Sequence, residues 1–316
     1  MSVTAYPPPV DRLLTIGDPH QSDPPRPELP DFEAMQEQGK DVQDLPHVPR
    51  PFASAHWPDY PATYGLGPEH VPDLLRLAEA ITFWALEDED DPAGWGPLHA
   101  WRALGQLRAE EAVKPLRALL EPLRDNDWFQ EEVTEVFGMI GAAAIAPLTV
   151  FLNDPRHEMY TRATAGSSIA AIGRMHPDAR AESIAALAGQ IEASLDYPDP
   201  DEDLVTLNGF LITDLMDVGA TEAMPTVRRA FEADLVDETI GGDLEDVEIG
   251  FGVRESRDTP RPRYGLLRDY SPGGGPGDPY GPGGGSGASR VTAPVQKAKR
   301  KQKIAKASRR KNRNKR

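Results

Sequence analysis

Three groups of closely spaced carboxylates are the first residues in this sequence that could carry chemistry. They lie at residues 87–91, at residues 199–203, and at Asp243, Glu245, Asp246 and Glu248. Adjacent acids do not by themselves form a general acid–base pair, because that chemistry needs two environments that move the two pKa values apart. The first run also lacks the glycine and the distal glutamate of a calcium-binding loop. We expect solvated loops or a surface for basic partners, and the last group could contact Arg254 of this chain or an arginine of a partner.

The sequence contains none of the common catalytic or metal-binding motifs. It has no cysteine, and its seven histidines occur singly without the HExxH spacing of a zinc site. GxGxxG, GxxxxGK[ST] and GxSxG are also missing, so no phosphate-binding loop or nucleophile elbow is predicted. We therefore predict no catalytic residue, no metal site and no cofactor, and we interpret His99 as a packed or capping residue.

The basic residues are concentrated at the C-terminus. From residue 271 onward there are 13 lysines and arginines and a single acid, Asp278, whereas positions 1–270 hold 21 basic and 50 acidic side chains. Twelve of the 13 cations lie between positions 297 and 316: Lys297, Lys299, Arg300, Lys301, Lys303, Lys306, Arg309, Arg310, Lys311, Arg313, Lys315 and Arg316. Such a tail binds phosphate backbones electrostatically, and without aromatic residues it is not expected to read bases. It predicts contact with RNA, DNA or a ribosome; a solubility tail and a tail folded back on the acidic body are the alternatives.

Four tryptophans gather in one region of the chain: Trp84, Trp95, Trp101 and Trp128. Packing between helices accounts for most such residues. Trp95 and Trp128 each follow a polar break at the start of a predicted helix, so one of them could lie exposed as an anchor for a protein partner. We take these two as candidate partner-binding residues.

The elements that must position these groups are helices. Between residues 67 and 236, apolar residues recur with the period of a buried helix face, first at 68–86 and then at 97–107, 110–120, 128–140, 143–152, 159–174, 178–195, 204–217 and 221–235. No stretch of strict alternation rivals these segments, so a sheet is not expected. The predicted fold class is therefore all-α.

Internal repetition is the strongest feature of the helical region. The segment ALGQLRAEEAVKPLRALL (103–120) matches DLMDVGATEAMPTVRRAF (214–231), and two further segments fit the same template. With Leu107, Ile140, Met175 and Val218 as equivalent marks, the steps are 33, 35 and 43 residues. A helix, a tight turn and a second helix at this period predict an α-solenoid of about four to five helical hairpins, with residues 67–78 as an N-terminal cap.

Four other stretches flank the predicted solenoid (67–236). Residues 1–66 contain 13 prolines and are expected to form an extended, disordered arm whose aromatic residues could pin its end to the body. Residues 237–270 are expected to form an acidic, irregular cap, a loop or a short strand-like segment, on the last helices. Residues 271–289 are rich in glycine and proline and are predicted to be a linker, followed by the disordered basic tail, 290–316.

The repeats resemble HEAT-type repeats of the short variety named after phycobilisome lyases. The stretch that includes WGPLHAWRALGQL, LNGFLITDLMDVGATEAMPTVRRAFEADLVDE and GGDLEDVEIGFGVRE is similar to a group of uncharacterised bacterial HEAT-like proteins over about residues 60–262. The resemblance implies the fold, places residues 243–248 in a recurring segment and implies no established activity. Many relatives end in a zinc-binding motif of cysteines and histidine, which this cysteine-free chain does not share, so no metal function is carried over.

Two classes of function follow from the sequence. The first is a non-enzymatic scaffold whose concave helix row holds a protein partner and whose tail adds affinity for nucleic acid or a ribonucleoprotein. The second is an enzyme or a maturation accessory of lyase type with a pocket between repeats, and self-association of tail and acidic body is a third possibility. The start of the chain lacks the pattern of a signal peptide, and its longest apolar runs are too short to span a bilayer. We therefore expect a cytoplasmic protein without a membrane span.

Overall fold

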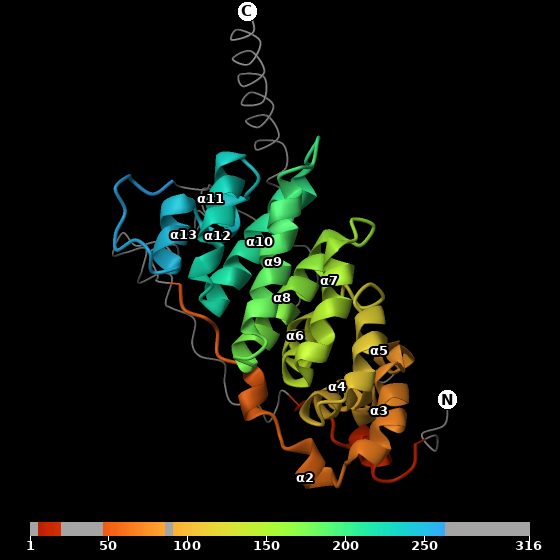
Figure 1. Cartoon of the computed structure of the whole chain (residues 1–316). Coiled ribbons are helices and arrows are strands. Elements are labelled where there is room, and N and C mark those ends of the chain that lie inside the picture. The colour runs from red at the N-terminus through yellow and green to blue at the C-terminus, as the bar shows by residue number, and fades with distance from the viewer. Residues whose placement is uncertain (1–5, 20–46, 86–90, 263–316) are drawn as a thin grey trace, which may run out of the picture. The chain divides into compact units, whose positions relative to one another are not determined.

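The computed structural model describes residues 6–19, 47–85 and 91–262. Within these ranges every regular element is an α-helix or a 3-10 helix and no strand is present, so the all-α prediction is confirmed (Figure 1). The predicted linker and basic tail lie outside the described residues.

Four pairs of helices form most of the molecule. The first helices of the pairs are α4 (Gly96–Gln106), α6 (Asp127–Ile140), α8 (Met159–Met175) and α10 (Glu202–Val218). The second helices are α5 (Val113–Ala118), α7 (Ile145–Asn153), α9 (Arg180–Ser194) and α11 (Met224–Glu232). Each first helix contacts the next first helix along the chain, and each second helix contacts the next second helix, so the pairs form two rows (Figure 1).

The ends of the helices follow from local side chains. The carboxamide of Asn126 accepts a hydrogen bond from the Phe129 amide at the start of α6, and Asp201 accepts one from the Leu204 amide at the start of α10. At the other end, α6 and α10 stop at Gly141 and Gly219, whose φ angles of 96° and 68° lie in the region that glycine tolerates best. The tight turn predicted between the two helices of a pair therefore occurs at a glycine in both cases.

The four marks of the sequence repeat occupy the same place in the structure. Ile140, Met175 and Val218 are the last residues of α6, α8 and α10, and Leu107 is the residue after α4. The residues three positions earlier are all fully buried: Leu104, Phe137, Ile172 and Leu215. The repeat period in the sequence therefore places equivalent core residues in each successive pair.

The N-terminal residues differ from the predicted extended arm. Residues Val10–Thr15 form a 3-10 helix whose Val10, Leu13 and Leu14 are buried in the main core. The helices α2 (Tyr60–Tyr64) and α3 (Val71–Ala78) follow, and both contact α4. Apolar side chains that recur within one short turn can bury themselves despite the neighbouring prolines, and this explains the difference. The helix predicted over 68–86 is broken after Ala78 and resumes as the 3-10 helix Ile81–Ala85.

The C-terminal cap is helical, and the predicted loop or strand-like segment is wrong for residues 238–250. It contains α12 (Glu238–Gly241) and α13 (Leu244–Gly250), which pack on α10 and α11. The side chains of Asp237 and Asp243 accept hydrogen bonds from the amides of Thr239 and Asp246 and so start the two helices. Two of the acids in this segment, Asp237 and Asp243, are therefore helix caps.

Candidate functional site

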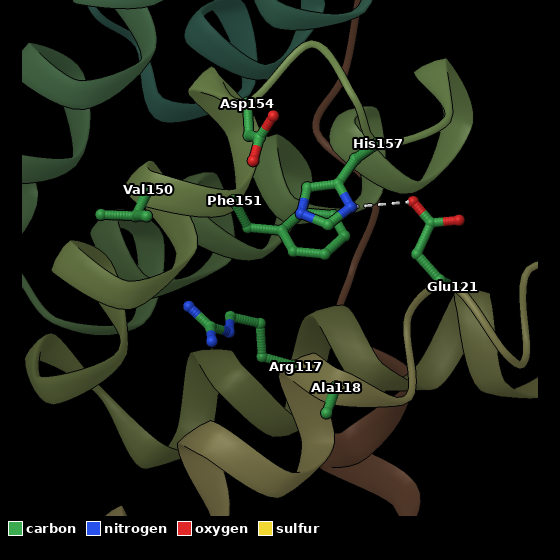
Figure 2. A pocket seen from close by; sticks show the side chains of 7 residues that line it. All are labelled: Arg117, Ala118, Glu121, Val150, Phe151, Asp154 and His157. Atoms are coloured by element: carbon green, nitrogen blue, oxygen red, sulfur yellow. Dashed lines mark hydrogen bonds and ion pairs between the residues drawn. The ribbon is translucent and has the colours of Figure 1, made fainter.

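A hollow of about 300 Å³ opens beside α5 and the connection between α7 and α8 (Figure 2). It is lined by Arg117, Ala118, Glu121, Val150, Phe151, Asp154 and His157. The His157 ring stacks on the Phe151 ring with 3.7 Å between centroids, and its Nδ1 lies 3.1 Å from Oε1 of Glu121. This places one imidazole and two carboxylates around a small space next to an exposed apolar side chain, Val150.

Both carboxylates of this hollow are held in the ionised form. Burial opposes the ionisation of Glu121, but hydrogen bonds from the Glu158 amide, from Thr161 and from His157 outweigh it and lower its pKa. Hydrogen bonds from the side chain and amide of Arg156 lower the pKa of Asp154 far below its ordinary value. General acid–base catalysis by a carboxyl pair needs one member protonated near neutral pH. The hollow therefore does not provide such a pair.

A smaller hollow of about 70 Å³ involves the acidic run at residues 199–203. Asp201 and Asp203 line it together with Arg162 and Tyr197. Asp201 also caps α10, and burial lowers the pKa of Arg162, whose Nε donates to the Leu152 carbonyl. Residues 199–201 belong to the connection between α9 and α10, whereas Glu202 and Asp203 lie in the first turn of α10, so the loop interpretation holds only for the first part of the run.

A segment of the N-terminal region lies across the first helices, and we call residues 47–57 the strap. Residues 47–52 have no regular secondary structure, and Ala53–His56 form a 3-10 helix. In Figure 1 it runs from the side of α13 to α2. Nε2 of His47 is 2.7 Å from Oδ1 of Asp217 on α10, and the Arg50 carbonyl accepts a hydrogen bond of 2.6 Å from Arg174 on α8. The strap therefore crosses α10 and then α8, in the order opposite to the chain.

The rest of the strap continues over α6 to α4. The amides of Ala53 and Ser54 donate to the two carboxylate oxygens of Glu135 on α6, at 2.9 and 2.7 Å. The Trp57 ring is buried and lies 4.4 Å from the guanidinium of Arg102 on α4. Trp57 thus fastens the end of the strap to α4, as the aromatic residues of this region predicted.

The contacts of the strap use equivalent positions of the repeat. Arg174 and Asp217 each lie one residue before a repeat mark. Gln106, also one residue before a mark, bonds the carbonyl of Pro58 and the amide of Tyr60 just beyond the strap. The C-terminal ends of the first helices therefore form one continuous contact face. This face was not predicted from the sequence, although comparing the residues next to the marks could have suggested it.

Asp214 lies one turn before Asp217 on α10 and is buried against α8. A Cβ on Gly166 of α8 would be 3.3 Å from its Oδ2, and this oxygen has no hydrogen-bond partner among the described residues. Burial raises the pKa of Asp214 to about 8, and the negative charge of Asp217 adds to this rise. A hydrogen bond from Ser167 and the positive charge of Arg174 oppose it. A buried carboxyl with such a pKa is a candidate functional group, and no spacing of residues in the sequence signals it.

The predicted acidic set of Asp243, Glu245, Asp246 and Glu248 is paired within the chain. Arg257 contacts Asp243 and Asp246, both at 2.6 Å, and Arg261 contacts Asp246 at 2.7 Å. Nε of Arg254 lies 2.7 Å from Glu248, so the predicted contact with Arg254 is confirmed. These ion pairs, which we call the arginine clasp, fasten residues 254–261 to α13.

Trp95 and Trp128 form an edge-to-face pair with ring centroids 6.2 Å apart. Both are partly buried against the main core, where they join the start of α4 to the start of α6. Their role as anchors for a partner stays a prediction. His99 is fully buried, with its ring nitrogens 2.7 Å from the Tyr60 hydroxyl and 2.8 Å from the Gly17 carbonyl, which confirms the packed-residue interpretation.

The described residues were also compared with the requirements of metal and membrane sites. Across residues 6–19, 47–85 and 91–262, no three histidine, aspartate or glutamate side chains are grouped as a metal ion would need. In the same ranges no single helix has the length and apolar character to cross a membrane. Taken together, α6 and the helical segment Ala142–Asn153 have that length and character, but the two are bent by 117° relative to each other. The twelve basic tail residues lie outside the described part of the chain.

Comparisons of the chain with protein-family models, with curated proteins and with solved structures found no match. Function must therefore be inferred from the contacts of this chain alone. Of the surfaces described above, the face beneath the strap is the one on which the molecule already holds a peptide segment.

Proposed function

We propose that this chain is an α-solenoid of HEAT-like hairpins that acts as a protein-binding scaffold. The four helix pairs in two rows, with equivalent buried residues three positions before each repeat mark, support this architecture. The carrying observation for function is the strap, a peptide segment without regular structure before its last 3-10 turn, which lies across the ends of α10, α8, α6 and α4. A face that binds one such segment through its backbone has the contacts needed to bind another.

The lyase-type alternative has less support from the geometry. The larger hollow holds two ionised carboxylates, and neither of the two hollows described is lined by Asp214, the buried group with the raised pKa. A catalytic site needs its titratable groups directed at a space that substrate can enter. We therefore favour binding over catalysis.

Site-specific photo-crosslinking from both helix rows tests the scaffold function. A photoreactive residue at Glu131, one turn before Glu135 on α6, reports on the first-helix row, and one at the exposed Ala146 of α7 reports on the second row. We expect cells expressing the Glu131 variant to yield a defined crosslinked protein that the Ala146 variant does not. Equal products from both positions would contradict a partner on the first-helix row.

We further propose that the basic tail adds non-specific affinity for nucleic acid or a ribonucleoprotein. Its twelve cations between positions 297 and 316 support this, because each cation that neutralises a phosphate releases a counterion. Neutralising the tail in the full chain, and measuring RNA and DNA binding across a salt series, tests this part separately from the scaffold.

A further inference from the structure

We infer that the ends of α6, α8 and α10 form a binding site for a partner's proline-containing peptide with an aromatic residue just before a short helical turn, and that the strap occupies this site in competition with it. The inference rests on the proposed scaffold function and specifies the chemistry of the partner. It follows from three contacts of the strap, each with a different requirement.

The first two requirements concern the peptide backbone and one ring. Glu135 accepts hydrogen bonds from two consecutive backbone amides, those of Ala53 and Ser54. Proline has no amide hydrogen, so it is excluded from both positions of the peptide. Arg174 donates to the Arg50 carbonyl, and its guanidinium lies 4.2 Å from the Phe52 ring. An aromatic residue two positions after that carbonyl is therefore favoured by the cation–π contact.

The third requirement concerns the residue that faces α10. His47 contacts Asp217 through a single ring nitrogen, and Asp217 also lies 3.8 Å from Arg174. An arginine at the His47 position has several N–H donors, so it can bond both oxygens of the Asp217 carboxylate. A partner segment with arginine five residues before its aromatic residue therefore has a contact that the strap does not make.

Prolines keep residues 49–52 of the strap extended without burying them, and Ala53–His56 form a 3-10 turn. Pro49 and Pro51 fix φ near the polyproline II value, and Phe52 has φ and ψ of −70° and 126°. Between Val48, which is 68% exposed, and Trp57, which is 7% exposed, the strap contributes no buried side chain. Residues 47–56 can therefore leave the face without opening the core, while Trp57 keeps the chain attached.

Binding of a labelled peptide to the full chain tests this inference. The peptide carries residues 46–56 (PHVPRPFASAH), and fluorescence anisotropy measures its affinity for the wild type, for Phe52→Ser and for the control Val48→Ser. Phe52→Ser weakens the internal competitor, so we expect it to bind the peptide about three- to tenfold more tightly than the wild type. Val48→Ser should equal the wild type, because this exposed side chain makes no contact with the face.

Variants of the peptide keep the test independent of protein folding. On the Phe52→Ser chain, a peptide with serine at the phenylalanine position or proline at the Ala53 position should lose binding, and one with arginine at the His47 position should bind more tightly. Equal affinity for all three chains, or undiminished binding of the proline peptide, would overturn the inference. A wild type that is dimeric through this face would assign the site to a second copy and also overturn it. If the peptide does not bind but crosslinking from Glu131 still recovers a protein, the scaffold function is supported and only this inference is contradicted.

Discussion

Two kinds of buried polar residue occur in the described part of the chain, and they have opposite consequences. Arg102 and Glu132 form an ion pair across α4 and α6, with hydrogen bonds of 2.5 and 2.8 Å, and Trp101 Nε1 donates a third bond to the same carboxylate at 3.1 Å. Asp214 is buried with one carboxylate oxygen that has no hydrogen-bond partner among the described residues. A paired buried charge resists the removal of either partner, whereas a buried carboxyl that is not fully paired favours the neutral form.

The Arg102–Glu132 pair is expected to be sensitive to the loss of one side. Glu132→Gln leaves a buried guanidinium without its counter-charge, so the free energy of unfolding should fall by about 3 kcal/mol. The double change Arg102→Met with Glu132→Leu removes both charges and should recover most of this loss. Urea unfolding measures both, with Arg124→Met, on a half-exposed side chain, as the control. Equal effects of Glu132→Gln and the control would show that the pair does not join the two helices.

Asp214 should make the stability of the folded chain depend on pH. Its folded-state pKa of about 8 lies above the ordinary 3.8, so between these values the folded chain keeps a proton that the unfolded chain loses. Relative to Asp214→Asn, the wild-type free energy of unfolding should therefore fall by about 1.4 kcal/mol for each pH unit between pH 5 and 7. Denaturant unfolding across this range gives the difference, and Asp178→Asn on an exposed residue should show no such slope. A constant difference between wild type and Asp214→Asn would contradict the raised pKa.

At the scale of the element, the close approach of successive first helices depends on small residues near their ends. A Cβ on Gly138 of α6 would lie 3.2 Å from the Ala171 Cβ of α8, and one on Gly105 of α4 would lie 3.3 Å from the Val136 Cα of α6. Both glycines stand two residues before a repeat mark. The spacing of the row is therefore set by the same position in two consecutive pairs.

Two glycine substitutions separate this packing role from helix propensity. Gly189 is exposed on α9, and a Cβ there would meet nothing within 4 Å, so Gly189→Ala should stabilise the chain by about 0.5–1 kcal/mol. Gly138→Ala has the same gain in propensity but crowds α8, so its net effect should be zero or destabilising, and Gly138→Leu should cost about 1–3 kcal/mol. Thermal unfolding measures all three. An equal gain from both alanine variants would show that α6 and α8 have room to separate.

The arginine clasp should determine how firmly residues 254–261 are held. Asp243 and Glu248 are held ionised. Burial opposes the ionisation of Asp243, but hydrogen bonds from Arg257 and the Asp246 amide outweigh it and lower its pKa, and hydrogen bonds from Arg254 and Arg228 lower the pKa of Glu248. Arg257→Gln removes the cation that contacts Asp243 and Asp246 and should speed amide exchange across residues 251–261 by about tenfold or more. Glu255→Gln, on an exposed side chain, is the matched control. Unchanged exchange in Arg257→Gln would mean that other contacts hold this segment.

At the scale of the whole molecule, the sequence predicted the structural features that recur in each helix pair. It did not predict the contacts that occur only once. The helix pairs and the turns at Gly141 and Gly219 follow from a period that each pair repeats. The strap could not be predicted, because Glu135, Arg174 and Asp217 meet it only after the pairs have packed side by side. The burial of Leu13 and Leu14 was not predicted, because the 13 prolines of residues 1–66 favoured an extended arm. Long-range contacts of this kind leave no spacing in the sequence.

The charge distribution of the whole chain leads to a prediction about salt. If roughly eight of the twelve tail cations engage phosphates, log affinity should fall with log salt concentration with a slope of about −6 for single-stranded RNA. A full chain with all twelve changed to glutamine should lose this binding, whereas one with the same tail residues in scrambled order should keep it, because the tail reads no sequence. Fluorescence anisotropy across a salt series from about 50 to about 300 mM measures the slopes, and sedimentation at the same salts detects self-association. A wild type that stays unbound at the lowest salt, while the isolated tail peptide binds, would place the tail on the acidic side chains of positions 1–270 instead.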